Sequence, residues 1–364
     1  MTPRKDNVLV AMSGGVDSSV AAALLREGGC DVTGVFLCLG QAAPDGESRG
    51  CCSPQDAADA RRAARALGID LHVLDCRDAF EPIIEHFVAE YARGRTPNPC
   101  ILCNRRVKFG RLTKLADSLG VRYVATGHHA RIAETADGPA VLRGRDRSKD
   151  QSYALFEVPR EWLARILLPI GEVDGKEQVR ARARSLGLAV HDKRDSQEIC
   201  FVPDDDYVAL LRQRCPEALR PGEIVDAAGE VLGRHDGYAR YTVGQRRGLG
   251  VAAGVPMYVT HIDPATARVT IGTRAEASGR HLSAAGASWH GDVPEAFDGV
   301  VQVRYNHRGA LARVRITGSE TFDVAFAEPA HAITPGQAAV VYQADRLLGG
   351  GWIEQAAPAT GPGG

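Results

Sequence analysis

Along the first 200 residues, short apolar runs alternate with segments whose apolar residues recur at helical spacing. The apolar runs predict buried strands at residues 7–12, 30–39, 69–76 and 121–127. The helical spacing occurs between them, at residues 20–29, 55–68, 79–94 and after Asn104. This alternation predicts an α/β fold whose doubly wound parallel sheet is covered by helices on both faces.

The pattern changes after about Pro203. Residues 204–278 form short, glycine-punctuated stretches, which predict a small β-rich central domain. Residues 279–357 contain strand-like runs at hairpin spacing, which predict a C-terminal β-barrel. We therefore expect three domains, with residues 1–203 as the α/β catalytic domain and residues 358–364 as a disordered tail.

Composition narrows the class of protein. The chain has 364 residues, 44% hydrophobic and 24% charged, as folded globular proteins do. No apolar run approaches the roughly 20 residues that cross a bilayer, and the start lacks a signal-peptide pattern, so no membrane partner is expected. Nine cysteines, an odd number, do not suit a secreted disulfide scaffold. We expect a cytoplasmic protein with reduced thiols.

The segment SGGVDSS, Ser13 to Ser19, joins the first predicted strand to the first predicted helix. Gly14 and Gly15 allow backbone N–H groups to turn inward beside a helix N-terminus, an arrangement that suits a phosphate group. A tight strand-to-helix turn would have the same pattern. No Gly-Lys-Ser/Thr or G-x-G-x-x-G follows, so kinase-type and dinucleotide loops are excluded. The segment resembles the pyrophosphate loop (PP-loop) of ATP pyrophosphatases, which cleave ATP between its α and β phosphates.

Two cysteines lie three residues apart in TPNPCILCNRRVKFG, at Cys100 and Cys103. A helix predicted to start near Asn104 would place Cys103 close to its N-terminus. Seven Lys and Arg residues and no acid occur between Arg93 and Lys114, and both features favour a thiolate. The spacing alone leaves a metal clamp, a redox pair and a nucleophile open.

The remaining cysteines are less informative. Cys200 lies where polar DSQE meets apolar ICFV, and either a reactive or a buried packing cysteine fits there. Structural zinc is disfavoured because a second pair at workable spacing is missing, and Cys51 and Cys52 are adjacent. Packing residues or ordinary thiols are expected at Cys30, Cys38, Cys76 and Cys215.

Taken together, these segments resemble the tRNA-uridine 2-sulfurtransferase family, whose bacterial members make 2-thiouridine at the wobble position of certain tRNAs. The resemblance runs nearly end to end through AMSGGVDSSV, GRTPNPCILCNRRVKF, YVATGHHAR, KDQSYALF, DSQEICFVP, YTVGQRRGLG, VRYNH, ITPGQAAVVY and GGGWIEQ. It implies that ATP adenylates the uracil C2 oxygen. Cys200 would carry sulfur as a persulfide from a sulfur-relay protein or cysteine desulfurase, and Cys103 would be the nucleophile. Cys103 would either attack the activated base or release hydrosulfide from the persulfide, which ends in a Cys103–Cys200 disulfide that needs reduction.

One position departs from the family pattern. Many relatives carry Asp where this chain has Cys100, which puts the acid/base role of that position in doubt and leaves Cys100 as an auxiliary residue. A second reading follows, in which Cys100, Cys103 and Cys200 hold a [4Fe-4S] cluster that binds hydrosulfide. The persulfide route is preferred because the resemblance gives Cys103 and Cys200 named roles.

The resemblance also implies binding residues. ATP contacts are expected at Ala11, Met12, Ser13, Gly14, Gly15, Val16, Asp17, Ser18, Leu37 and Gly127. Mg²⁺ is expected with ATP, with Asp17 as its candidate ligand. Contacts to tRNA of the lysine, glutamate and glutamine type are expected at Asn98, Pro99, Cys100, His128, Lys149, Asp150, Gln151, Arg304, Tyr305 and Gln337.

Two other classes of function remain open at this point. An amide-forming ATP pyrophosphatase would share the phosphate loop, but the paired cysteines, the KDQ segment and the barrel argue against it. A non-catalytic RNA-binding protein would not need an intact SGGVDSS. Basic clusters in several motif-bearing loops favour tRNA, although each alone suits a solvated surface.

Overall fold

The computed structural model describes residues 6–40, 53–193, 199–202 and 206–358. They form two compact units. Unit 1 comprises residues 1–83, 100–205 and 345–347, and unit 2 comprises residues 84–99, 206–344 and 348–364. The predicted domain boundary near Pro203, Cys51, Cys52 and residues 359–364 of the predicted tail lie outside the described residues.

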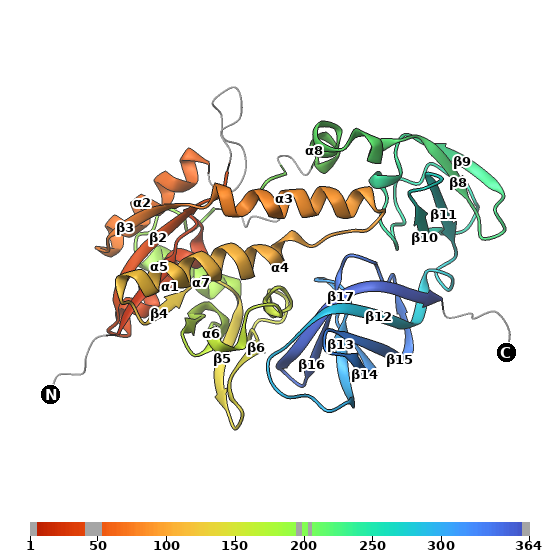
Figure 1. Cartoon of the computed structure of the whole chain (residues 1–364). Helices are drawn as coiled ribbons and strands as arrows, with labels where there is room; N and C mark the ends of the chain where they lie inside the picture. The colour runs from red at the N-terminus through yellow and green to blue at the C-terminus, as the bar shows by residue number, and fades with distance from the viewer. Residues whose placement is uncertain (1–5, 41–52, 194–198, 203–205, 359–364) are drawn as a thin grey trace. The chain divides into compact units, whose positions relative to one another are not determined.

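Unit 1 is built on a five-stranded sheet in the order β3-β2-β1-β4-β7. Figure 1 labels β2, β3 and β4 of this sheet. The strand pairs of the sheet are all parallel, as predicted. The strands are β1 (Asn7–Ala11), β2 (Asp31–Cys38), β3 (Leu71–Asp75), β4 (Tyr123–Ala125) and the unpredicted two-residue β7 (Ile166–Leu167). The doubly wound α/β architecture is confirmed.

This sheet is contacted by the helices α1 (Val16–Glu27), α2 (Pro54–Leu67) and α5 (Gly110–Leu119). Further helices that lie wholly or partly in unit 1 are α3 (Arg77–Ala92), α4 (Pro99–Cys103), α6 (Arg160–Leu163) and α7 (Lys176–Ser185), with a π-helical segment at Asn104–Phe109 and 3-10 turns at Ser152–Leu155 and Pro169–Glu172. In one core cluster, Val8 and Val10 of β1 pack with the alanines of α1 and with α2 and α7. Alanine lets α1 approach the sheet closely, while α5 packs against β1 and β4.

Unit 1 also contains an antiparallel hairpin that the sequence analysis did not predict. It consists of β5 (Ala130–Thr135) and β6 (Gly138–Arg143). Arg346 pairs with Leu142 of β6, and its guanidinium donates to Asp137 at 2.7 Å. The hairpin begins directly after His129, so it fixes the end of the segment that follows β4.

Unit 2 contains two β structures. A four-stranded sheet has the order β10-β11-β8-β9, from β8 (Gly222–Val225), β9 (Val231–His235), β10 (Tyr258–Asp263) and β11 (Arg268–Gly272). A six-stranded barrel runs β12-β15-β14-β13-β16-β17 and closes through β12–β17 pairing. Its strands are β12 (Ser278–Trp289), β13 (Ala296–Gln302), β14 (Ala310–Gly318), β15 (Thr321–His331), β16 (Ala338–Gln343) and β17 (Arg346–Pro358). Both predicted β structures are confirmed.

The barrel is held by a core that alternates inward along the strands and includes Val301, Val314 and Phe322. Unit 2 further contains α8 (Tyr207–Arg214) and 3-10 turns at Pro216–Leu219 and Tyr238–Arg240. Residues 84–99 group with it: Tyr91 stacks on Tyr207 at 4.7 Å, and the Tyr238 hydroxyl donates to the Ala92 carbonyl at 2.8 Å. The segment preceding Cys100 thus belongs to unit 2.

Across the described ranges, no helix has both the length and the apolar character that a membrane span requires.

Candidate active site

The loop between β1 and α1 is shaped by a glycine that no other residue can replace without strain. Gly14 has φ +76°, and a Cβ there would lie 2.2 Å from the backbone oxygen of Asp56. Helix α2 packs this closely because its start is fixed by a capping box between Ser53 and Asp56, with Pro54 in the first turn. The loop is therefore pressed against the first turn of α2.

The same loop leaves the start of α1 available to an anion. Gly15 is the N-cap and supplies no side-chain cap. The Ser18 hydroxyl accepts from the Ser13 N–H at 3.2 Å and donates to the Gly15 carbonyl at 3.1 Å, and the Ser19 hydroxyl donates to the same carbonyl at 2.9 Å. Serine hydroxyls thus fix the loop from within, while the first N–H groups of α1 lack partners inside the helix.

The predicted nucleotide residues lie around the carboxyl ends of β1, β2 and β4. Gly127 follows β4, and a Cβ there would lie 2.6 Å from the Ser18 nitrogen, so only glycine lets this segment reach the start of α1. Leu37 and Met12 are buried. Open α/β sheets bind ligands at this edge. The individual ATP contacts stay predictions.

Asp17 is held by two residues, of which Lys176 was not anticipated. Lys176 Nζ donates to both carboxylate oxygens, at 2.8 and 2.6 Å, and His129 Nε2 lies 3.3 Å from Oδ1. Burial alone would raise the pKa of Asp17, but the hydrogen bonds and charges of His129 and Lys176 outweigh it and lower the pKa below its usual value. A carboxylate with this pairing is ionised at neutral pH.

A second lysine, Lys193, also reaches the loop. Its Nζ donates to the Gly14 carbonyl at 3.0 Å, to Asp56 at 2.7 Å and to Asp59 at 2.6 Å. Lys193 and Lys176 are 179 and 159 residues away from their loop partners along the chain. No short-range pattern could have identified either of them.

The two neighbouring cysteines both lie in α4. This helix starts at Pro99, five residues before the predicted start near Asn104, because a proline in the first helical position needs no N–H partner. Cys100 is exposed, whereas Cys103 is only 5% exposed. The following π-helical segment buries Asn104, whose Nδ2 donates to the Ala154 carbonyl at 2.9 Å.

Cys200 is the second cysteine of the predicted sulfur-transfer pair, with Cys103 as the first. It is partly buried, and the neighbouring Phe201 packs edge-on against Phe80, with ring centroids 5.5 Å apart. Within the described part of the chain, no three His, Cys, Asp or Glu side chains are placed to share a metal ion. Cys100, Cys103 and Cys200 therefore do not form a ligand set for a [4Fe-4S] cluster in this conformation.

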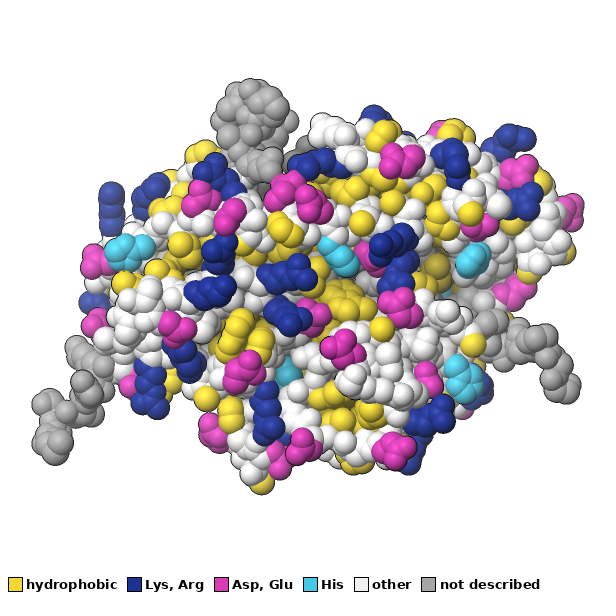
Figure 2. Space-filling model, viewed as in Figure 1, with side chains coloured by type: hydrophobic (Ala, Val, Ile, Leu, Met, Phe, Trp, Pro, Cys, Tyr) yellow, Lys and Arg dark blue, Asp and Glu magenta, His cyan; other side chains and the backbone are white. Residues whose placement is uncertain are grey.

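The basic stretch around the cysteines is largely neutralised by acids from outside it. Carboxylates pair with Arg93, Arg95, Arg105 and Arg111, from Glu90, Glu354, Glu157 and Asp78. On the face visible in Figure 2, basic and acidic side chains are interspersed as well. The stretch from Arg93 to Lys114 has no acid of its own, but four of its seven basic side chains pair with acids from elsewhere in the chain.

Several predicted tRNA residues of unit 1 serve the fold itself. Asp150 accepts from Arg143 at 3.0 Å, from the Gly144 N–H and from Ser152, and the Gln151 side chain accepts from the His129 N–H at 2.9 Å. His128 is buried, and its Nδ1 lies 2.6 Å from the Thr126 hydroxyl. Burial, with Lys108 and His129 nearby, lowers the pKa of His128 well below its usual value, so the ring is neutral. Lys149 is partly exposed, and RNA contact by these residues stays a prediction.

In unit 2, the residues before Cys100 are bound by the barrel. Gln337 Nε2 donates to the Thr96 and Pro97 carbonyls at 2.8 and 3.3 Å, and the Thr96 N–H donates to the Pro335 carbonyl at 2.9 Å. Arg95 is anchored by Glu90 and by Glu354 of β17, each at 2.7 Å. This anchor fixes the backbone that leads into Asn98 and Pro99.

The remaining predicted tRNA residues of unit 2 lie at the barrel. Arg304 donates to the His331 and Ala332 carbonyls at 3.0 and 3.2 Å, while Tyr305 is 42% exposed. An exposed ring beside a fixed cation can stack on an unpaired base. The contact itself stays a prediction.

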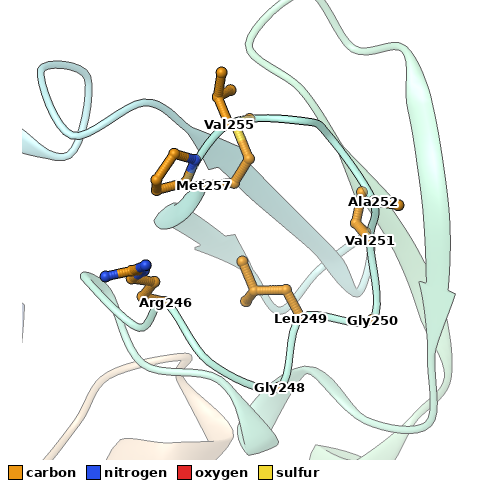
Figure 3. A pocket seen from close by; sticks show the side chains of 9 residues that line it. Arg246, Gly248, Leu249, Gly250, Val251, Ala252, Val255 and Met257 are labelled. Atoms are coloured by element: carbon orange, nitrogen blue, oxygen red, sulfur yellow. The ribbon is translucent and has the colours of Figure 1, made fainter.

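Unit 2 also contains a separate pocket of about 460 Å³. One glycine-rich loop, residues 246–257, lines it with mostly apolar side chains, among them Leu249, Val255 and Met257 (Figure 3). Arg246 is its single charged group. With no carboxylate or nucleophile in its lining, this pocket offers no chemistry comparable to that of the phosphate loop.

Comparison with protein families places each part of the chain. Residues 6–204 match the tRNA methyl transferase HUP domain, residues 209–273 the tRNA methyl transferase PRC-barrel domain, and residues 279–353 the aminomethyltransferase beta-barrel domain. The first match alone covers more than half of the chain.

Full-length relatives agree. The tRNA-specific 2-thiouridylase MnmA of Carboxydothermus hydrogenoformans is 50% identical over 359 residues, which cover 96% of this chain and 98% of the relative. The proteins of the same name from Paramagnetospirillum magneticum and Syntrophotalea carbinolica are each 46% identical, over 96% and 97% of this chain and 96% and 100% of their own lengths. This chain therefore belongs to the tRNA-specific 2-thiouridylase MnmA family.

Proposed function

We propose that this protein is an ATP-dependent tRNA-uridine 2-sulfurtransferase that converts the wobble uridine of its substrate tRNAs to 2-thiouridine. The observation that carries the proposal is the identity of 50% with a 2-thiouridylase over nearly the full length of both chains. The geometry of the phosphate loop and the presence of Cys103 and Cys200 as reduced thiols support the same conclusion.

The first step activates a poor leaving group. The uracil C2 oxygen attacks the α-phosphorus of ATP, a bond forms between them, the α–β phosphoanhydride breaks, and pyrophosphate leaves. N3 of the base loses its proton. The start of α1 and the Gly14–Gly15 backbone would bind the β and γ phosphates, where fixed N–H dipoles meet the departing charge.

Mg²⁺ would supply charge neutralisation for the phosphates. Asp17 is the residue that would hold it, and it can do so only by exchanging Lys176, which engages both carboxylate oxygens. The released ammonium would then lie close enough to Asp17 to meet the same phosphates. Lys176 and Asp17 thus stabilise each other until a polyanion and its cation arrive.

The second step delivers sulfur. Cys200 would receive a persulfide from the sulfur donor, either a relay protein or a cysteine desulfurase. In one route the Cys103 thiolate attacks the Cys200 sulfur of the persulfide and releases hydrosulfide, which adds to C2 and expels AMP. In the other, the terminal persulfide sulfur adds to C2 first, AMP leaves, and Cys103 then cleaves the S–S bond.

Both routes transfer the same number of electrons and give the same products. The electron pair of the broken S–S bond goes to the sulfur that stays on the base, N3 regains a proton, and Cys103 and Cys200 end as a disulfide. A dithiol reductant must supply two electrons before the next turnover. Cys103 is 5% exposed, so its segment has to move for this step.

The test combines two readouts. Purified protein is incubated with ATP, Mg²⁺, a cysteine desulfurase with cysteine as the persulfide donor, and tRNA that lacks the modification; nucleotide products are separated, and the tRNA is digested for mass spectrometry. We expect 2-thiouridine and AMP in equal amounts. ADP as the product, or no thiolation of any tRNA, would contradict the proposal.

A further inference from the structure

One residue outside the predicted nucleotide-binding set, Lys193, connects the phosphate loop to helix α2 through hydrogen bonds. Lys193 Nζ has three hydrogen-bond donors, and each has an acceptor: the Gly14 carbonyl, Asp56 Oδ1 and Asp59 Oδ2, at 3.0, 2.7 and 2.6 Å. The ammonium is therefore fully committed to the loop and to α2. It cannot act as a ligand of the phosphates without giving up one of these bonds.

The position of the two carboxylates explains why a cation is needed there. Asp56 belongs to the first turn of α2, whose backbone lies directly against Gly14, and the side chain of Asp59 is only 9% exposed. Their other oxygens already have partners: Ser53 donates to Asp56 Oδ2, and Gln55 and Arg62 donate to Asp59 Oδ1. Without Lys193, two negative charges of low exposure would face a loop that must receive a polyanion.

The backbone that carries Lys193 is itself fixed. Arg180 of α7 donates to the His191 and Lys193 carbonyls, both at 2.9 Å. Lys176 lies in the same helix, one turn before Arg180, and its Nζ donates to Asp17. One face of α7 thus supports both lysines that border the loop.

We propose that Lys193 is a positioning residue of the phosphate loop, which orients the Gly14 carbonyl and neutralises Asp56 and Asp59 so that α2 can pack against the loop without repelling the ATP phosphates. This inference rests on the proposed function, since it assumes that ATP binds at this loop. It assigns no chemical step to Lys193. The residue acts only through Gly14 and the two carboxylates.

The experiment measures ATP binding by calorimetry and the KM and kcat of tRNA-dependent AMP release. In Lys193→Met, we expect ATP affinity to fall at least about tenfold, because two poorly exposed carboxylates lose their shared cation. KM for ATP should rise in parallel, while kcat at saturating ATP falls by less than about threefold. Wild-type affinity in folded Lys193→Met would overturn the inference.

A charge rescue separates neutralisation from a general structural role. Adding Asp59→Asn to Lys193→Met removes one of the two carboxylate charges that Lys193 neutralises in the wild type, so at least about a third of the lost binding free energy should return. No recovery would contradict the neutralising role. Arg62→Met is the matched control: it removes a cation from the other oxygen of Asp59, on the exposed side, and should change affinity less than about twofold.

Thermal unfolding will show whether Lys193→Met folds. If it does not, Asp59→Asn alone tests the inference. It leaves Lys193 and its bond to Gly14 in place, so ATP should bind at least as tightly as in the wild type. A loss of more than about threefold would overturn the inference. If the wild type itself neither binds ATP nor releases AMP, the proposed function fails instead, and the two failures are thus distinct.

Discussion

The phosphate loop and the cysteine helix α4 differ in how ready they are for chemistry. Ser13 is exposed, Gly15 is partly exposed, and serine hydroxyls and two lysines fix the loop in place. Cys103 is 5% exposed, and the backbone before Cys100 is tied to the barrel through Thr96 and Pro97. Under the proposed function, nucleotide binding at the loop requires only that Lys176 be displaced from Asp17, whereas sulfur transfer requires the segment of the buried Cys103 to move. The contrast favours an order in which the base is activated before sulfur is released.

The largest expected effect tests the sulfur side of this contrast. Cys103→Ser and Cys200→Ser should each lower persulfide-dependent thiolation at least about 1,000-fold, because an alcohol neither attacks nor carries sulfane sulfur at neutral pH. ATP binding should stay within about twofold of wild type. Cys30→Ser, at a partly buried cysteine of unit 1, is the control. Full turnover in both mutants would show that the assigned sulfur roles are wrong.

The second prediction tests the phosphate loop by adding one methyl group to it. Gly14→Ala places a Cβ 2.2 Å from the Asp56 oxygen at φ +76°, so the loop must distort, and AMP release should fall about 100-fold. Gly29→Ala has a similar φ of +87° but nothing within 4 Å, so it carries the backbone strain without the collision. Equal losses in the two mutants would mean that strain, and not loop shape, explains the effect.

A third change addresses the anchor of the cysteine helix. Arg95→Met removes the ion pairs to Glu90 and Glu354, and we expect thiolation to fall about tenfold with ATP affinity unchanged, since the segment leading to Cys100 loses one of its anchors on the barrel. Arg93→Met removes an exposed partner of the same Glu90 and is the matched control. An equal change in ATP affinity would contradict the separation of the two regions.

The smallest effect is a pH dependence at the loop. The folded pKa of Asp17 lies below its usual value of 3.8, so its pairing with Lys176 and His129 stabilises the protein above about pH 4 and is lost as pH falls through the folded pKa. The stability difference between wild type and Asp17→Asn, from urea midpoints, should therefore be larger at about pH 5 than below about pH 4. A difference that grows on acidification would have the wrong sign.

The two regions also differ in how far the sequence predicts them. Strand periodicity located β1 to β4, and SGGVDSS located the loop, because both depend on neighbouring residues. The start of α4 was placed five residues late, since Pro99 reads as a turn residue although it begins the helix. The β5–β6 hairpin was missed because its strands are only partly buried and lack continuous apolar runs.

The sequence alone could not predict the ion pairs between residues that are far apart along the chain. Lys176, Lys193 and Arg95 are bound to partners 159, 137 and 259 residues away, so nothing near them marks their roles. The same reason explains the basic stretch from Arg93 to Lys114, whose partners Asp78, Glu157 and Glu354 lie outside it.

The central claim is that ATP activates the C2 oxygen of the target uridine, and isotope transfer tests it most directly. tRNA whose target uridine carries ¹⁸O at C2 is thiolated, and the AMP produced is analysed by mass spectrometry. The account predicts one ¹⁸O in the phosphate of each AMP for each 2-thiouridine formed. Thiolated tRNA accompanied by unlabelled AMP would contradict it.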